Sequence, residues 1–171
     1  MGPRDFQGGR GLKPIMDRWN SFLRLSGFER GVAIEALAGL AATWVGLRLA
    51  GFRHWKNALE WLAPRATRSE ARATNASLAE CAQVIARMQA AAARNLFFTT
   101  NCLEQSLVLW WLLRLRGIAS ELRVGARKDS GRFEAHSWVE FDGKVLNDAG
   151  EEHLHFVPFE GPIISMETQT R

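Results

Sequence analysis

The chain reads Phe97-Phe98-Thr99-Thr100-Asn101-Cys102-Leu103-Glu104-Gln105-Ser106-Leu107 at the point that decides its fold. The three residues before Cys102 are all of types that cap helices, and an apolar, tryptophan-rich helical pattern follows from Leu103 to Leu115. We therefore expect Cys102 to be the first or second residue of a helix. Backbone N–H groups are free at such an end, so they lower the pKa of a thiol and can hold an oxyanion.

Helical periodicity dominates the sequence before this stretch. We expect helices over Ile15–Leu25, Phe28–Ala50 and Trp55–Leu62, and a long alanine-rich helix with an apolar stripe from Leu78 to Ala92. Gly51 is expected to end the second of these helices and Pro64 to close the third, because both residue types interrupt helices. The polar, arginine-rich residues after Pro64 are expected to form a linker.

One of these helices tests for a membrane span. The segment Val32–Phe52 is apolar but contains Glu35 and Arg48. The uncharged part between them is shorter than the roughly 20 apolar residues that a bilayer requires. We therefore expect a buried helix and no membrane span.

The apolar period changes to two after Ser120, which indicates strands. Leu122 and Val124 alternate with polar residues, and further strands are expected over Phe133–Phe141 and Lys144–Asp148, with an edge strand over Val157–Ile164. Turn residues separate these segments at Lys128–Gly131 and Asp142–Gly143. Helices followed by a small antiparallel sheet make an α+β fold.

Length and composition fit one globular unit with a helical extension. The chain has 171 residues, of which 47% are hydrophobic, so it can bury a core. We expect a flexible tail over residues 1–14, a helical region over 15–65, a core domain over 66–165 and a second tail over 166–171. The net charge of +4 comes from scattered basic residues, which gives no sign of nucleic-acid binding.

Cysteine usage and the first residues indicate the compartment. Two cysteines, Cys81 and Cys102, do not make a disulfide framework. The segment Gly2–Pro14 is polar and has no apolar core of a secretory signal peptide. A reducing cytoplasmic location is therefore expected.

The two cysteines differ in their surroundings. Cys81 lies in the middle of an apolar helical stripe, where a cysteine usually acts as a small hydrophobic residue. Cys102 is expected at the start of a helix. His136 lies downstream in a strand-like segment, where it can serve as a base. His153 and His155 are two metal-ligand types without a third, which is a weak signal, so we expect no metal. Nothing in thiol chemistry requires a cofactor.

The turn at Asp142–Gly143 determines which acid can orient His136. A two-residue loop would pair Phe141 with Lys144 and turn Asp148 away from His136. A three-residue loop over Phe141–Gly143, with Gly143 in a left-handed bulge position, would set Asp148 directly opposite His136. We expect the three-residue loop, with Asp148 orienting the imidazole as the third member of a triad and Asp142 only forming the turn.

A wider pattern resembles the transglutaminase-like superfamily, and within it the leader peptidases of lasso-peptide maturation. The pattern comprises Asn101–Leu107, Arg116–Ile118, Gly125–Lys128, Ala135–Glu140 and Asp142–Gly143. The resemblance covers Leu78–Asp148 well and Ile15–Pro64 only in helical character. It implies a papain-like core in which Cys102 is the nucleophile, His136 the base and Asp148 the orienting residue.

The resemblance also implies an activity and partners. The activity is cleavage of a precursor peptide between leader and core through a thioester, without metal or cofactor. Residues 1–14 are too few for a leader-recognition domain, so a separate recognition protein acting in trans is expected, and a lasso cyclase is a further candidate partner. Gln105 and Trp138 are candidate substrate-binding residues, although a solvent-facing or capping role for Gln105 and core packing by Trp138 are alternatives.

Two other functions fit the same residues. The triad could pass an acyl group to an amine instead of water, which is transglutaminase-type transfer. The chain could also be a non-catalytic binding module on this fold, although a complete Cys-His-Asp set argues against that. Mass spectrometry of products separates hydrolysis from transfer, and alkylation of Cys102 separates a catalytic thiol from an inert one.

Overall fold

The helix that begins at Cys102 lies at the centre of the fold. The computed structural model describes residues 22, 24–63, 75–129, 131–148 and 150–159. Its elements are α2 (Gly27–Leu62), α3 (Asn75–Asn95), α4 (Cys102–Leu115), β1 (Glu121–Asp129), β2 (Arg132–Phe141), β3 (Lys144–Val145), the short 3₁₀ helix η1 (Glu152–His155) and β4 (Val157–Pro158). The expected tails, most of the expected helix Ile15–Leu25 and the linker after Pro64 lie outside the described residues.

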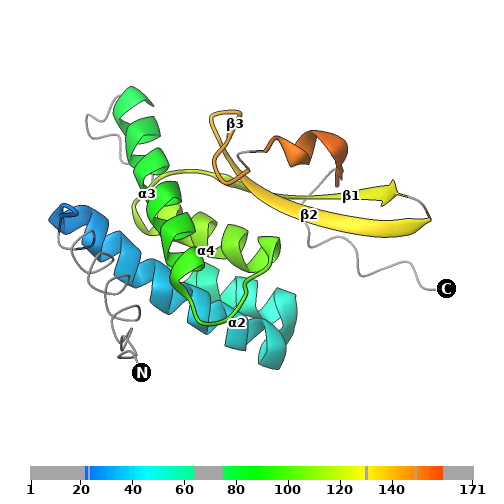
Figure 1. Cartoon of the computed structure of the whole chain (residues 1–171), viewed down its shortest axis with the longest axis horizontal. Coiled ribbons are helices and arrows are strands. Elements are labelled where there is room, and N and C mark those ends of the chain that lie inside the picture. Colours follow the sequence, from blue (N-terminus) through cyan, green and yellow to red (C-terminus); the bar gives the residue numbers. More distant parts are fainter. Residues whose placement is uncertain (1–21, 23, 64–74, 130, 149, 160–171) are drawn as a thin grey trace, which may run out of the picture.

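In the described part of the chain, three α-helices and one sheet make an α+β arrangement, which confirms the expected fold class. The strands are antiparallel in the order β3-β2-β1-β4. Helix α4 packs on β2 with one side and on α2 and α3 with the other, so it lies between the sheet and the other helices (Figure 1). The helix that carries Cys102 is thereby held from both sides.

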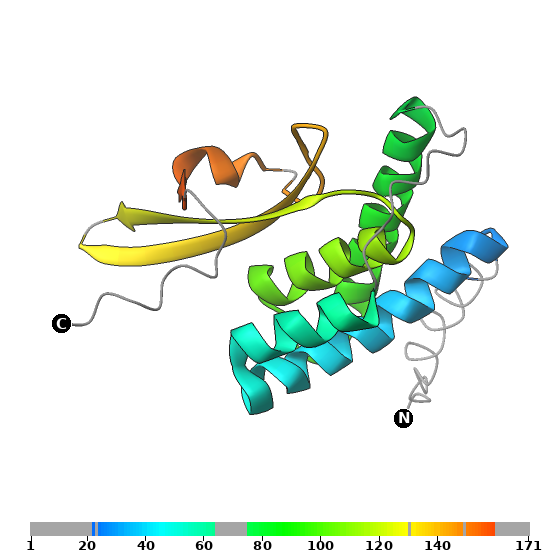
Figure 2. The ribbon, with the colours of Figure 1, turned by 180° about the vertical axis from the view of Figure 1, so that it is seen from behind.

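Helix α2 has a sharp kink at Gly51. Its start is fixed by a capping box, in which Ser26 and Glu29 exchange hydrogen bonds. Gly51 has φ 74° and ψ 171°, which ends the first helical arm as expected. The second arm folds back on the first (Figure 2), because Trp55 lies over Gly46 and its Nε1 donates to the Thr43 hydroxyl at 3.1 Å.

Two charged residues of α2 pair with α4 or with the residue that caps its C-terminus. Glu35 binds Arg116 at 2.6 Å, and Arg48 binds Glu104 at 2.9 Å. By length and apolar composition alone, α2 could cross a membrane. Both charges that interrupt its apolar segment are paired within the fold, and its buried side chains contribute to the shared core. We therefore interpret α2 as a core helix.

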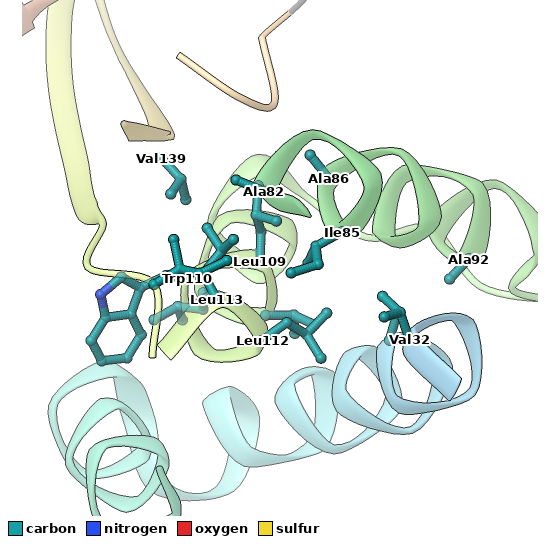
Figure 3. Packing of buried hydrophobic residues seen from close by; sticks show 14 of the residues in the cluster. Val32, Ala82, Ile85, Ala86, Ala92, Leu109, Trp110, Leu112, Leu113 and Val139 are labelled. Atoms are coloured by element: carbon teal, nitrogen blue, oxygen red, sulfur yellow. The ribbon is translucent and has the colours of Figure 1, made fainter. Parts of the chain in front are cut away.

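The core joins α2, α3 and α4 to one strand residue of β2. Val139 is fully buried against α4, and Leu109, Leu112 and Leu113 of α4 are fully buried as well (Figure 3). Each such side chain contributes about 1.5–3 kcal/mol by leaving water. Because α4 is covered on two sides, its sequence is apolar almost all round, which explains the dense pattern from Leu103 to Leu115.

The turn between β2 and β3 differs from the expected one. Phe141 pairs with Lys144 and Glu140 with Val145, so the loop is the two-residue Asp142–Gly143 and the expected three-residue loop is wrong. Asp142 has φ 49° and Gly143 has φ 73°. Two left-handed residues match the twist of the flanking strands better than other two-residue turns do, and aspartate tolerates this conformation.

Two expected strands are shorter than predicted. Strand β3 ends at Val145, so Asp148 lies outside the strand, and the expectation that it is a strand residue is wrong. The edge strand is present where Val157–Ile164 was expected, because β4 pairs with β1 through Gly125 and Ala126. It covers only Val157–Pro158, and residues from 160 onward lie outside the described part of the chain.

Candidate active site

Cys102 is the first residue of α4, as expected from the sequence. The helix start is a complete capping box: the Asn101 side chain accepts from the Glu104 backbone N–H, and the Glu104 carboxylate accepts from the Asn101 N–H, both at 2.9 Å. Glu104 is only 2% exposed, and Arg48 balances its charge. The free N–H groups of this first turn can hold an oxyanion beside Cys102.

Gln105 fixes the backbone just before the nucleophile candidate. Its side-chain amide donates to the carbonyl of Thr100 at 3.2 Å and to the Thr100 hydroxyl at 3.1 Å. The Gln105 amide thus binds the segment before the helix and caps none of the free N–H groups at the helix start. A contact of Gln105 with substrate stays a prediction.

His136 lies on β2 and contacts two aromatic rings. Its ring stacks on Trp138 with a centroid separation of 6.0 Å and lies 5.3 Å from the ring of Phe156. Gly125, the partner of His136 in β1, leaves room for these rings, because a Cβ there would lie 3.0 Å from both Trp138 and Phe156. Two aromatic rings thus pack against the imidazole.

Trp138 is a buried side chain. It is 1% exposed, and its Nε1 donates to the Glu140 carboxylate at 2.7 Å. Its ring therefore supports His136 by packing. A contact of Trp138 with substrate also stays a prediction.

Asp148 is brought beside His136. Its Oδ2 lies 3.6 Å from Nε2 of His136, and the Asp148 side chain is 6% exposed. That separation suits an ion pair but is too long for a hydrogen bond. The Nε2 atom is buried and has no hydrogen-bond partner among the described residues. Asp148 is therefore the acid next to this nitrogen, as expected, although the predicted register is wrong.

The side-chain amide of Asn147 explains how Asp148 comes to lie beside His136. The ladder between β2 and the following segment ends with the hydrogen bond from the Leu146 N–H to the Val139 carbonyl. The Val139 N–H then donates to Oδ1 of Asn147 at 2.8 Å, so a side chain replaces the next backbone acceptor. The chain leaves the strand direction at Asn147. As a result, Asp148 lies next to His136 instead of in strand register opposite Ser137.

A buried polar network joins the three elements that carry the candidate residues. The Ser106 hydroxyl of α4 donates to the Ser137 carbonyl of β2 at 2.9 Å, and the Asn147 amide donates to the same hydroxyl at 2.9 Å. Ser106 follows Cys102 by one helical turn, so the two share one face of α4. No hydrogen bond joins the Cys102 thiol to His136 within the described residues, and catalytic hydrogen bonds often tighten only with substrate.

His153 is the residue that sequence reasoning missed. Its backbone N–H and its Nδ1 approach Oδ2 of Asp148 at 2.6 and 2.9 Å. Burial raises the pKa of Asp148, but hydrogen bonds from His153 and the backbone of Glu152, with the nearby His136, outweigh it and hold the pKa below its ordinary value. The sequence offered only a weak metal signal for His153, because η1 is a single turn without periodicity.

The described residues contain no group of three or more histidine, cysteine, aspartate or glutamate side chains arranged to hold a metal ion. His153 is engaged with Asp148, and His155 is exposed on the same turn.

Comparison with known proteins places this site in a family context. Residues 37–160, well over half of the chain, match the family model described as the transglutaminase-like superfamily. The microcin J25-processing protein McjB of Escherichia coli is 42% identical over 52 residues, which are 30% of this chain and 24% of that protein. The match thus spans about a quarter of that relative's length. No solved structure gives a significant match.

Proposed function

The chain belongs to the transglutaminase-like superfamily, and from this premise we propose that it is a cysteine peptidase that removes the leader from a lasso-peptide precursor. The observation that carries the proposal is the 3.6 Å approach of Asp148 to His136, on a strand packed against the helix that begins at Cys102. The likeness to a microcin-processing protein supports a ribosomally made peptide as the substrate.

Proton transfer comes first in the proposed mechanism. Nε2 of His136 faces Asp148, which leaves Nδ1 as the nitrogen that takes the proton from the Cys102 thiol. The Asp148 carboxylate stabilises the imidazolium that forms, and its lowered pKa keeps it charged at neutral pH. The free N–H groups at the start of α4 stabilise the thiolate.

Acyl transfer to the thiol follows. The thiolate attacks the carbonyl of the bond between leader and core, and the N–H groups of the first turn of α4 hold the oxyanion. His136 returns its proton to the leaving amine, which frees the core peptide and leaves the leader as a thioester on Cys102. Water then attacks the thioester, with His136 as base, and releases the leader carboxylate and the thiol.

The proposal includes partners and a compartment. The substrate is the leader–core junction of the precursor, presented by a separate recognition protein, with a lasso cyclase acting on the released core. A cytoplasmic location fits the two free cysteines. Co-purification of the chain with the recognition protein, in the presence and absence of leader peptide, tests the first of these partners.

The superfamily to which the chain belongs also suggests a second candidate, acyl transfer to an amine. The thioester and the triad are common to both reactions, and only the acceptor differs. Hydrolysis produces two free termini, whereas transfer produces a new amide or isopeptide linkage, so the acyl product of transfer is heavier than that of hydrolysis by the mass of the acceptor amine less one water. Intact-mass analysis of the reaction therefore decides between them.

The central experiment uses a precursor peptide chosen from the neighbouring reading frames. The wild type and Cys81→Ala should release leader and core at similar rates, and Cys102→Ala should release neither. Cys81 is the matched control because it lies in α3, away from the start of α4. Full cleavage by Cys102→Ala would show that the nucleophile assignment is wrong.

Alkylation tests the alternative of a non-catalytic module without any substrate. Iodoacetamide at neutral pH should modify Cys102 faster than Cys81, because the helix start and His136 favour its thiolate. Peptide mapping separates the two sites. Equal rates at the two cysteines, both of them partly exposed, would favour the binding module.

A further inference from the structure

We propose that His153 is a positioning residue of this site, which holds the Asp148 carboxylate in place for His136. The inference rests on the proposed function, because it assigns a role within the same Cys102–His136–Asp148 arrangement. No sequence pattern marks His153, and its placement depends on the turn after Asp148.

The contacts on one oxygen carry the inference. Oδ2 of Asp148 lies 2.6 Å from the backbone nitrogen of His153, 2.9 Å from its Nδ1 and 3.6 Å from Nε2 of His136. His153 therefore makes both short contacts, and His136 makes the longer one. The same oxygen serves both histidines, so whatever fixes it also fixes the acid that His136 faces.

A carboxylate needs such a restraint. The last torsion of an aspartate side chain has a broad energy profile, so Asp148 would rotate if it had one long contact alone. Two donors from His153 on one oxygen, together with the backbone hydrogen bond from Glu152, define that rotation. The Nε2 atom of His136 is buried without another partner among the described residues, so a rotated Asp148 would leave it unpaired.

Packing against Trp138 holds the His153 ring beside Asp148. Its ring lies 5.8 Å from Trp138, whose ring stacks on His136. The side chain of His153 is 18% exposed. The two histidines thus pack on one tryptophan and face one carboxylate, while His155 on the same turn is exposed.

The charged and titratable groups around His136 come from the neighbouring strands and from the segment after β3. Asp148 faces it from that segment, and His153 lies behind Asp148 and against Trp138. Arg127 of β1 lies 4.8 Å over the ring of Phe156, which packs on His136. Glu140 is bound by Trp138 on β2. Of these groups, His153 alone makes short contacts with Asp148, so a change at His153 should act on His136 through that carboxylate.

Three substitutions of His153 separate positioning from packing. His153→Asn keeps an amide donor near the place of Nδ1 but loses the ring. His153→Phe keeps a ring against Trp138 but loses the donor. His153→Gln places its amide near the Nε2 position, so it lacks the donor without being apolar, and it replaces His153→Phe if that variant does not fold. His155→Phe is the matched control.

Positioning predicts a split between kcat and KM on a precursor peptide. His153→Phe and His153→Gln should lower kcat about tenfold, the effect of one hydrogen bond to a charged group, with KM within about twofold. His153→Asn should keep kcat within about threefold, and His155→Phe should match the wild type. Unchanged or raised kcat in His153→Phe, or an equal loss in His153→Asn and His153→Phe, would overturn the inference.

A second readout needs no peptide substrate. The rate of Cys102 alkylation by iodoacetamide is followed from pH 5 to 9 in the full chain. If Asp148 is displaced, the imidazolium of His136 is less stable, so in His153→Phe and His153→Gln the midpoint should move to higher pH, and in His153→Asn it should stay. An unchanged midpoint in both donor-free variants overturns the positioning role. Failure of wild-type cleavage with a shifted midpoint would instead reject only the leader-peptidase function.

Discussion

The side-chain amide of Asn147 donates a 2.9 Å hydrogen bond to the hydroxyl of Ser106, which joins the segment before Asp148 to the helix that begins at Cys102. The same hydroxyl donates to the Ser137 carbonyl, next to His136. Residues 41 positions apart in sequence thus determine how the candidate acid, base and nucleophile are arranged.

Removal of this link should lower the stability of the fold. Asn147→Ala leaves the buried Val139 N–H without its acceptor, so the free energy of unfolding should fall by about 1–3 kcal/mol. Ser106→Ala should cost a similar amount, and the double variant should lose less than the sum, because both changes remove one network. Urea unfolding of the four proteins measures the coupling. Asn57→Ala, at an exposed position of α2, is the control, and strict additivity of the two losses would contradict a shared network.

Asp148 and Asp142 should behave differently in turnover. Asp148→Asn removes the charge beside His136, so kcat should fall on the order of a hundredfold, as expected for impaired general base catalysis. Asp142→Asn should leave kcat unchanged, because asparagine also tolerates the left-handed conformation of this turn. Kinetics on a precursor peptide measure both variants. An equal loss in both would mean that Asp148 has no special part in orienting His136.

The pKa of Asp148 predicts a stability difference that depends on pH. Its pKa is lowered in the folded state, so the unfolded state binds more protons in acid and stability rises with pH. The stabilisation by Asp148 is complete above the unfolded value of about 3.9 and is lost as pH falls through the folded value. The free energy of unfolding of the wild type relative to Asp148→Asn should therefore be largest between about pH 5 and 7 and shrink below about pH 4. Urea titrations across pH 3–7 measure it, and a difference independent of pH would refute the prediction.

Gly125→Ala should disturb the rings around His136. The new Cβ would lie 3.0 Å from Trp138, from Phe156 and from the Val157 carbonyl, so at least one of them must move. Overpacking of this kind costs about 1–3 kcal/mol, and kcat should fall as well because His136 loses its support. Gly31→Ala, in α2 with no atom within 4 Å of its Cβ, is the control and should be neutral or stabilising. Thermal unfolding and peptide kinetics compare the two variants. Wild-type stability and kcat in Gly125→Ala would be inconsistent with tight packing at this position.

Local signals predicted the helical part of the fold well. The break at Gly51 and the start of α4 at Cys102 follow from a glycine that leaves the helical region and from the capping box of Asn101 with Glu104. These effects act within four residues, so a sequence pattern contains all the information they need. The change to a period of two likewise predicted β1 and β2.

The turn shows where local signals became insufficient. Asp142–Gly143 is compatible with a two-residue and a three-residue loop, and the choice between them sets the register of everything after it. The expected loop was wrong, yet Asp148 still lies beside His136, because Asn147 ends the ladder early. Nothing in the sequence near Asn147 indicates that its amide would replace a backbone acceptor.

The sequence by itself determined that a cysteine stands at a capped helix start and that a histidine follows on a strand, because both depend on contacts between near neighbours. Only the tertiary structure decided which groups surround Asp148. The Asn147 amide reaches the Ser106 hydroxyl of α4 only after α4 and the sheet have packed together, whereas His153 meets Asp148 within the segment that this bond holds in place. A bond between distant segments depends on how whole elements pack together, and a sequence pattern does not directly predict that packing.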